Sequence, residues 1–126
     1  KNEMEYLDLN SIYNFIEKDL SNDYVIFQKT IKAFLDTSKN NFTEIKNCLE
    51  SGNLKRLKTE AHSLKSPSLL LGAKSLGEFC IKMESWSELP ESFSGRQKII
   101  DDFSEIYEKT IEELIHISTS YEPIAA

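Results

Sequence analysis

The stretch "LKRLKTEAHSLKSPSLLL", residues 54–71, has an apolar pattern with the period of a helix. Its small and apolar members recur at alternating spacings of three and four: Leu54, Leu57, Ala61, Leu64, Ser68 and Leu71. Such spacings place side chains on one face of a helix and form the seam of a helix bundle. We therefore predict a helix over residues 53–71, closed by Gly72, whose seam packs against other helices.

The segments before this stretch repeat the same period. Residues 7–20 predict a short first helix with Asp8 or Asn10 as its N-cap. Residues 21–51 predict a long helix that ends at Gly52. Its middle, "DTSKNN" at residues 36–41, contains weak helix formers, so we expect a bend or break there.

The segments after it predict two further helices, over residues 74–86 and 96–120, separated by a loop at "SELPESFSG", residues 87–95. No stretch shows the period of two that is typical of strands. The predicted fold class is all-α, an antiparallel four-helix up-down bundle with a short extra N-terminal helix. We expect one domain over residues 1–126, with a lead-in at 1–7 and a tail at 121–126.

Composition narrows the function classes. Hydrophobic residues make up 40% and charged residues 29% of the 126 residues, as in ordinary globular domains. A net charge of -6 disfavours nucleic acid and anionic membranes as partners. Cys48 and Cys80 are expected to be buried, reduced thiols that form neither a disulfide nor a metal site. No apolar run is long enough to span a membrane, and we expect a cytoplasmic protein. The start at Lys1 suggests a piece of a longer protein or a trimmed chain.

His62 points away from the predicted core. At about 100° per residue it lies roughly 130° from the centre of the seam, so it is expected to be partly exposed. Lys58 precedes it by four residues and Lys65 follows it by three, and both spacings bring side chains together on a helix. Their charges favour a neutral, nucleophilic imidazole and suit an attached phosphoryl group. The alternative is a surface histidine without a role. His116, in the last helix, is expected to pack or to lie on the surface.

The string "AHSLKSPSLLLGA" at residues 61–73, followed by "KSLGEFCIKMES", resembles the histidine-containing phosphotransfer (Hpt) domain of two-component phosphorelays. The phosphoacceptor segment of that family reads roughly A-H-x-L-K-G-S-x-x-x-L-G-A. The matching positions are Ala61, His62, Leu64, Lys65, Leu71, Gly72 and Ala73. The opening "YLDLNSI", residues 6–12, is similar to the lead-in of such domains at the ends of hybrid sensor kinases.

The resemblance implies a role for several side chains. His62 would accept and donate the phosphoryl group, and Lys65 would neutralise it. Lys58, which the helical spacing places beside His62, is expected to help stabilise the same group. Glu84 would bond the other imidazole nitrogen and fix its tautomer, although a solvated glutamate is the alternative. Ser66 stands where the family usually has glycine, and we expect it to affect docking together with Leu69.

Pro67 follows Ser66 and removes a backbone donor from the predicted helix, at a cost of about 3 kcal/mol in a straight helix. We expect a kink there, because the seam continues through it. The alternative is a helix that ends early.

The resemblance further implies a phosphorelay intermediate that takes a phosphoryl group from a receiver-domain aspartate and passes it to another receiver. The receiver of its own hybrid kinase is one such partner. Any Mg²⁺ would sit on the receiver; the domain itself is expected to need no cofactor, to lack ATP-dependent kinase activity and to be monomeric. The alternatives are a receiver-binding module without transfer and the phosphotransfer segment of a chemotaxis-type histidine kinase. A hydrolase is the weakest option, because no second catalytic group is evident.

Overall fold

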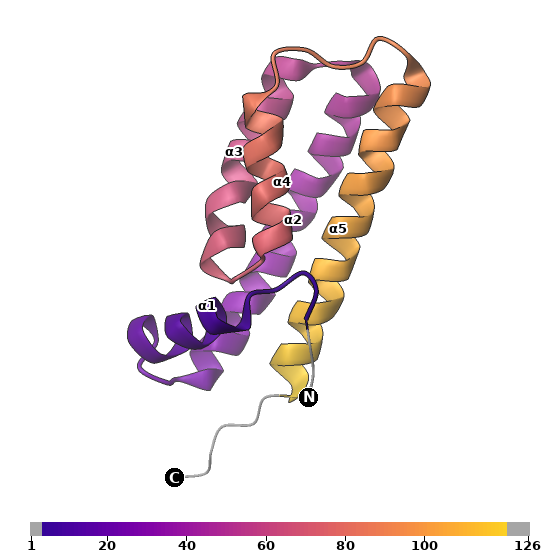
Figure 1. The fold of residues 1–126 in the computed structure, drawn as a ribbon. Helices are drawn as coiled ribbons and strands as arrows, with labels where there is room; N and C mark the ends of the chain where they lie inside the picture. Colours follow the sequence, from indigo (N-terminus) through magenta and orange to yellow (C-terminus); the bar gives the residue numbers. More distant parts are fainter. Residues whose placement is uncertain (1–3, 121–126) are drawn as a thin grey trace.

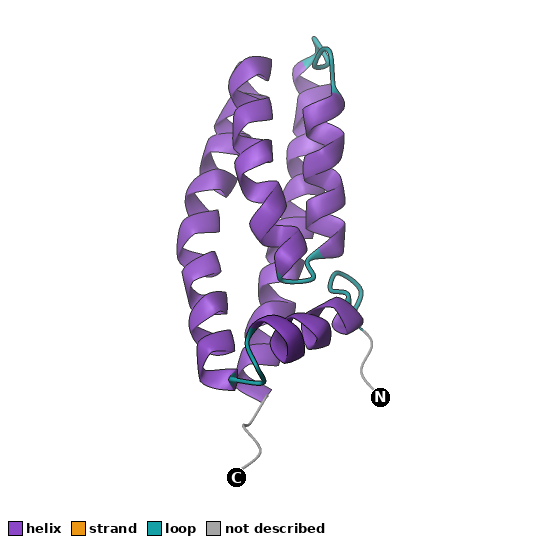
Figure 2. Cartoon of the chain, turned by 90° about the vertical axis from the view of Figure 1, so that its left-hand side faces the viewer, coloured by secondary structure: helices purple, strands orange, loops and turns teal. Residues whose placement is uncertain are grey.

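A computed structural model describes residues 4–120 of the chain (Figure 1). It contains α1 (Leu9–Asn14), a π-helical turn η1 (Phe15–Asp19), α2 (Tyr24–Ser51), α3 (Leu54–Leu70), α4 (Lys74–Ser85) and α5 (Phe93–Ser120). No strand occurs among these described residues (Figure 2). The predicted all-α class is confirmed. The predicted tail at 121–126 and the first three residues of the predicted lead-in lie outside the described residues.

The four long helices form the bundle. Helix α2 packs against α3 and α5, and α4 packs against α3 and α5, which closes the ring of four. Helix α1 and η1 lie across one end of it, beside the start of α2 (Figures 1 and 2). The interior is a single core in which Phe27 and Phe103 are fully buried and Phe42 stacks on Tyr107 with 4.3 Å between ring centroids. Burial of these rings, together with the aliphatic side chains of the core, favours assembly of the bundle.

Helix α2 is continuous, so of the bend or break predicted at residues 36–41 the break is wrong. The hydroxyl of Thr37 is hydrogen bonded to the carbonyl of Ala33 at 3.0 Å, within the helix. Ser38 is buried, and its Oγ lies 2.8 Å from the hydroxyl of Tyr107 on α5. A buried hydrogen bond of this kind outweighs the few tenths of a kcal/mol by which serine disfavours a helix.

Helix α5 begins at Phe93, earlier than predicted, so the predicted loop at 87–95 is too long. The hydroxyl of Ser92 accepts the backbone N–H of Gly95 at 3.0 Å, which is the contact of an N-cap. The Arg96 guanidinium donates to the carbonyls of Pro90 and Glu91, both at 2.9 Å. These local bonds add residues 93–95 to the helix although their composition favours a loop.

Helix α3 runs through Pro67 and does not end early. The carbonyl of Pro67 accepts the N–H of Leu71 at 3.2 Å, and the buried stripe continues through Ser68. The carbonyl of Ser63 loses its usual donor, but Ser63 lies on the exposed side of the helix, where water can replace it. The tertiary packing of the seam therefore overrides the local cost of the proline.

We expect Pro67→Ala to raise the free energy of unfolding by about 2 kcal/mol. The change restores one helical hydrogen bond and removes a steric clash, and the looser unfolded chain offsets part of the gain. Pro90→Ala, in the loop before α5, is the matched control and should lower the same quantity by about 0.5 kcal/mol. Urea unfolding of both variants measures the difference. A Pro67→Ala protein no more stable than the wild type would show that α3 carries no strain at this point.

The N-terminal segment is fixed to the turn between α3 and α4. Asp8 caps α1 by accepting the N–H groups of Asn10 and Ser11, and it also accepts the Ser11 hydroxyl at 3.0 Å. The hydroxyl bond first, and then the N–H bonds, hold the pKa of Asp8 below its usual range. The N–H of Asp8 donates to the carbonyl of Gly72 at 2.7 Å. Gly72 has φ +70°, and a Cβ there would lie 2.7 Å from Cγ1 of Ile12 and 2.9 Å from the Asp8 carbonyl oxygen. Glycine is therefore needed at this position both for its backbone angle and for its small size.

Candidate functional site

The site lies on the hairpin formed by α3 and α4, which residues 71–73 connect. The two helices are antiparallel. A residue of α3 therefore lies opposite the residue that is about as many positions after the turn as it is before it. The Nζ of Lys58 reaches the Trp86 carbonyl, and Nδ1 of His62 reaches Glu84. The hairpin therefore brings together groups that are more than twenty residues apart in sequence.

His62 stands on the surface with its ring held at one nitrogen. Its side chain is 70% exposed, and Nδ1 lies 2.7 Å from Oε2 of Glu84. Among the described residues Nε2 has no hydrogen-bond partner. The structure thus places His62 outside the core, as its position 130° from the seam predicts, with one nitrogen bound and the other facing solvent.

Glu84 accepts from two side chains of α3. Oε1 lies 2.7 Å from Nζ of Lys65, and Oε2 binds His62. These hydrogen bonds, with that of Lys65 the stronger influence, hold the pKa of Glu84 below its ordinary 4.5, against the effect of partial burial. The carboxylate is therefore ionised at neutral pH and has no proton to give, so Nδ1 must be the donor. In the neutral ring this leaves the lone pair on Nε2.

Packing of α4 explains why Glu84 is in reach. The helix buries the stripe of Leu76, Cys80 and Met83 in the core. Glu84 follows Met83 directly and so lies at the edge of that stripe, with its side chain 23% exposed. The predicted contact with the imidazole is present, and the sequence alternative of a solvated glutamate does not describe this geometry.

The two lysines that flank His62 have different contact partners. Lys65 is paired with Glu84 beside the imidazole, whereas the ammonium of Lys58 donates to the backbone carbonyl of Trp86 at 2.9 Å. No hydrogen bond joins Lys58 to His62 among the described residues. The contact between Lys58 and the Trp86 carbonyl was not predicted. Folding the chain back on itself at Gly72 would have shown that Lys58 and Trp86 lie opposite each other.

The predicted docking residues lie further along the same side of α3. Ser66 is exposed, and Leu69 is 42% exposed. Leu69 lies over Gly77 of α4, where a Cβ would come within 2.3 Å of its Cδ2. Leu69 also borders a groove of about 320 Å³ between α1–η1 and the end of α3. The lining is mixed polar and apolar: Ser11, Asn14, Phe15, Lys18, Asp19, Leu69 and Leu70.

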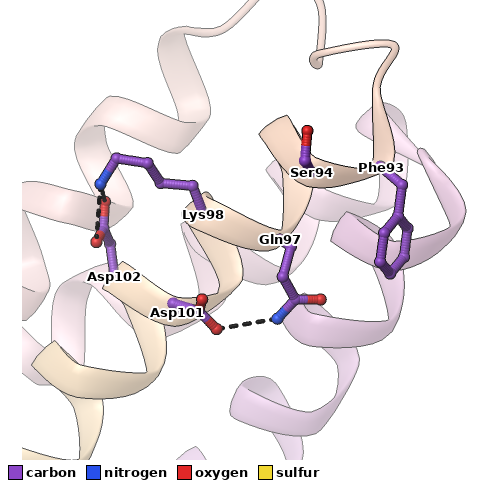
Figure 3. Close-up of a pocket in the computed structure, with 6 residues that line it drawn as sticks. All are labelled: Phe93, Ser94, Gln97, Lys98, Asp101 and Asp102. Atoms are coloured by element: carbon purple, nitrogen blue, oxygen red, sulfur yellow. Dashed lines mark hydrogen bonds and ion pairs between the residues drawn. The ribbon is translucent and has the colours of Figure 1, made fainter.

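A second hollow, of about 430 Å³, lies on the first turns of α5 (Figure 3). Its charged and amide side chains pair with one another: Lys98 with Asp102 at 3.2 Å, and Gln97 with Asp101 at 2.9 Å. Neither a histidine nor a cysteine lines it. We assign it no part in the site.

Other sequence predictions can be placed as well. Cys48 and Cys80 are free and buried, as predicted, and burial raises the pKa of the Cys80 thiol to about 12. His116 is exposed on α5. Within residues 4–120 no group of three or more His, Cys, Asp or Glu side chains is arranged to hold a metal ion. In the same part of the chain no helix is both long and apolar enough to span a membrane.

Comparison with known families gives the class of protein. Residues 29–116 match the Hpt domain, a span that includes α3, α4 and most of α2 and α5 but not α1 and η1. This places the chain among the histidine phosphotransfer modules of two-component signalling, which interact with receiver domains and are not autonomous kinases. The chain belongs to the Hpt domain family. Comparison with curated proteins and with solved structures gave no match.

Proposed function

We propose that this chain is a phosphorelay intermediate that accepts a phosphoryl group on Nε2 of His62 from the aspartyl phosphate of one receiver domain and passes it to another. The observation that carries the proposal is the 2.7 Å contact between Nδ1 and Glu84 on a side chain that is 70% exposed. It leaves one nucleophilic nitrogen, and that nitrogen faces the side from which a partner can approach.

The transfer step follows from this arrangement. The Nε2 lone pair attacks phosphorus in line, an N–P bond forms, and the P–O bond to the receiver aspartate breaks to release its carboxylate. Nδ1 keeps its proton, so the phosphorylated ring is positively charged, and the Glu84 carboxylate stabilises that charge. The second transfer reverses these steps with another receiver aspartate as the nucleophile. Mg²⁺, which such receivers hold in their acidic pocket, would belong to the partner.

Lys65 supplies the positive charge for the phosphoryl group in this proposal. Its ammonium is 2.7 Å from Glu84 before transfer, on the next turn of α3 after His62. A phosphoryl group on Nε2 offers three oxygens, which are strong acceptors for an ammonium group. Lys65 can then exchange Glu84 for the phosphoryl oxygens while Glu84 keeps its bond to Nδ1.

A receiver would dock over the same side of α3, across Ser66, Leu69 and the groove beside α1 and η1. Leu69 and Leu70, 42% and 51% exposed, offer apolar surface next to charged Lys18 and Asp19. Mixed surfaces of this kind suit transient partners. The Ser66 side chain, where the family usually has none, narrows the approach to His62 and so restricts which receivers fit.

The test is to mix the purified protein with a panel of phosphorylated receiver domains and Mg²⁺ and to follow the label. We expect label that is acid-labile and base-stable, as phosphohistidine is. The purified protein should take up no label from ATP alone, because we propose no kinase activity in this chain. Labelling from ATP would contradict that part of the proposal.

We expect Glu84→Ala to slow labelling of His62 about tenfold, because the tautomer is no longer fixed and the charged ring loses its counter-charge. Glu84→Gln should lose less, since its amide oxygen can still accept from Nδ1. Glu78→Ala, an exposed glutamate of the same helix, is the matched control and should label at the wild-type rate. Initial rates with one phosphorylated receiver measure the three variants. Equal rates for Glu84→Ala and the wild type would show that the contact with His62 has no part in transfer.

A further inference from the structure

The end of α4 is held by a residue of α3. Nζ of Lys58 donates to the carbonyl of Trp86 at 2.9 Å, and Trp86 is the first residue after the helix, with extended backbone angles of φ -72° and ψ 139°. The hydrogen bond from the Trp86 N–H back to Met83 is long, at 3.4 Å. The last turn of α4 is therefore weakly closed by its own backbone.

A short helix needs such support at its C-terminus. Helix α4 has 12 residues, and the last four carbonyls of any helix lack partners within it. A cation near this end also interacts favourably with the helix dipole. Lys82, in the last turn itself, lies over the ring of Phe79 at 5.7 Å. Lys58 supplies a hydrogen bond from outside the helix.

Glu84 lies in this last turn, two residues before Trp86. Its carboxylate must face His62 and Lys65 together, and both oxygens are used at 2.7 Å. A carboxylate held at both oxygens tolerates little movement of the backbone that carries it. Fraying of the turn would therefore move Glu84 away from Nδ1.

We propose that Lys58 is a positioning residue: by binding the Trp86 carbonyl it fixes the last turn of α4 and keeps the Glu84 carboxylate on Nδ1 of His62. This differs from the sequence-based prediction that Lys58 contacts the phosphoryl group. Its effect on transfer rests on the proposed function, but its effect on the imidazole does not. Lys65 remains the lysine that exchanges Glu84 for the phosphoryl oxygens.

The experiment measures the His62 tautomer in the unphosphorylated protein, from the ¹⁵N chemical shifts of the ring nitrogens. Lys58→Met keeps most of the aliphatic stem and removes the donor. We expect it to lower the ratio of Nδ1–H to Nε2–H rings about threefold and to speed amide hydrogen exchange in the last turn of α4 several-fold. Lys58→Arg should restore both, because its guanidinium can reach the same carbonyl. Lys82→Met is the matched control and should leave the tautomer unchanged.

Two results would overturn the proposal. One is a Lys58→Met protein with the wild-type tautomer and exchange but a shorter phosphohistidine lifetime, which would make Lys58 a direct contact of the phosphoryl group. The other is a variant unchanged in all three measurements. If Lys58→Met changes the tautomer but no receiver phosphorylates the wild-type protein, the role of Lys58 is supported and the proposed function is rejected. Failure of the Lys58 proposal can therefore be distinguished from failure of the proposed function.

Discussion

The His62→Gln protein should take up no label from any phosphorylated receiver that labels the wild type. Glutamine has no nucleophilic ring nitrogen, although its amide can still donate to Glu84 from a similar position. The side chain is 70% exposed, so we expect the free energy of unfolding to change by less than about 0.5 kcal/mol. Loss of label would then result from the missing acceptor nitrogen and not from unfolding of the variant.

The matched control for this prediction is His116→Gln, the other histidine of the chain, which is exposed on α5. It should label at the wild-type rate with the same receivers. Equal labelling of His62→Gln and the wild type would place the phosphoryl group on another residue and refute the proposed function. Absence of label on both proteins, with the cognate receiver present, would favour a module that binds receivers without transfer.

Gly72→Ala should destabilise the protein far more than Gly52→Ala. Both glycines have a left-handed backbone, with φ +70° and +79°, so either change costs about 1–2 kcal/mol for that angle alone. A Cβ at Gly52 meets nothing within 4 Å, whereas at Gly72 it overlaps Ile12 and the Asp8 carbonyl oxygen. Overpacking of this kind adds about 1–3 kcal/mol. We expect losses of about 1 kcal/mol for Gly52→Ala and about 3–4 kcal/mol for Gly72→Ala.

Urea unfolding measures this difference, and amide exchange locates it. In Gly72→Ala the fastest new exchange should be in α1 and η1, because the bond from the Asp8 N–H to the Gly72 carbonyl is the one disturbed. Binding of a receiver should weaken in the same variant if α1 and η1 line the docking surface. Equal costs at the two glycines would show that α1 can move aside without loss.

The sequence predicted the fold class and most helix boundaries because its apolar period and its glycines act locally. Gly52 and Gly72 end their helices at the predicted positions, and the seam of α3 is buried as expected. The errors arise where a distant or short-range polar contact overrides propensity. Ser38 stays helical because it bonds Tyr107, 69 residues away, and residues 93–95 are helical because Ser92 caps them.

The candidate site was also predictable only in part. The exposure of His62 follows from helical geometry, and the resemblance to the Hpt domain singled out Glu84. The partner of Lys58 was not predictable from the stripe of α3 alone, because a backbone carbonyl has no signature in the sequence. The groove beside Leu69 also depends on where α1 packs, which helical periodicity does not determine.

The site is built from one helical hairpin, and this has a consequence for the order of folding. The bonds that join Lys58 and His62 to α4 span 28 and 22 residues, whereas Glu113 receives the N–H groups of Glu5 and Tyr6 across more than 100. Short loops close at a smaller entropic cost than long ones. His62 and Glu84 can therefore meet early, before the two ends of the chain are joined. Loosening of those ends should then leave the arrangement around His62 intact.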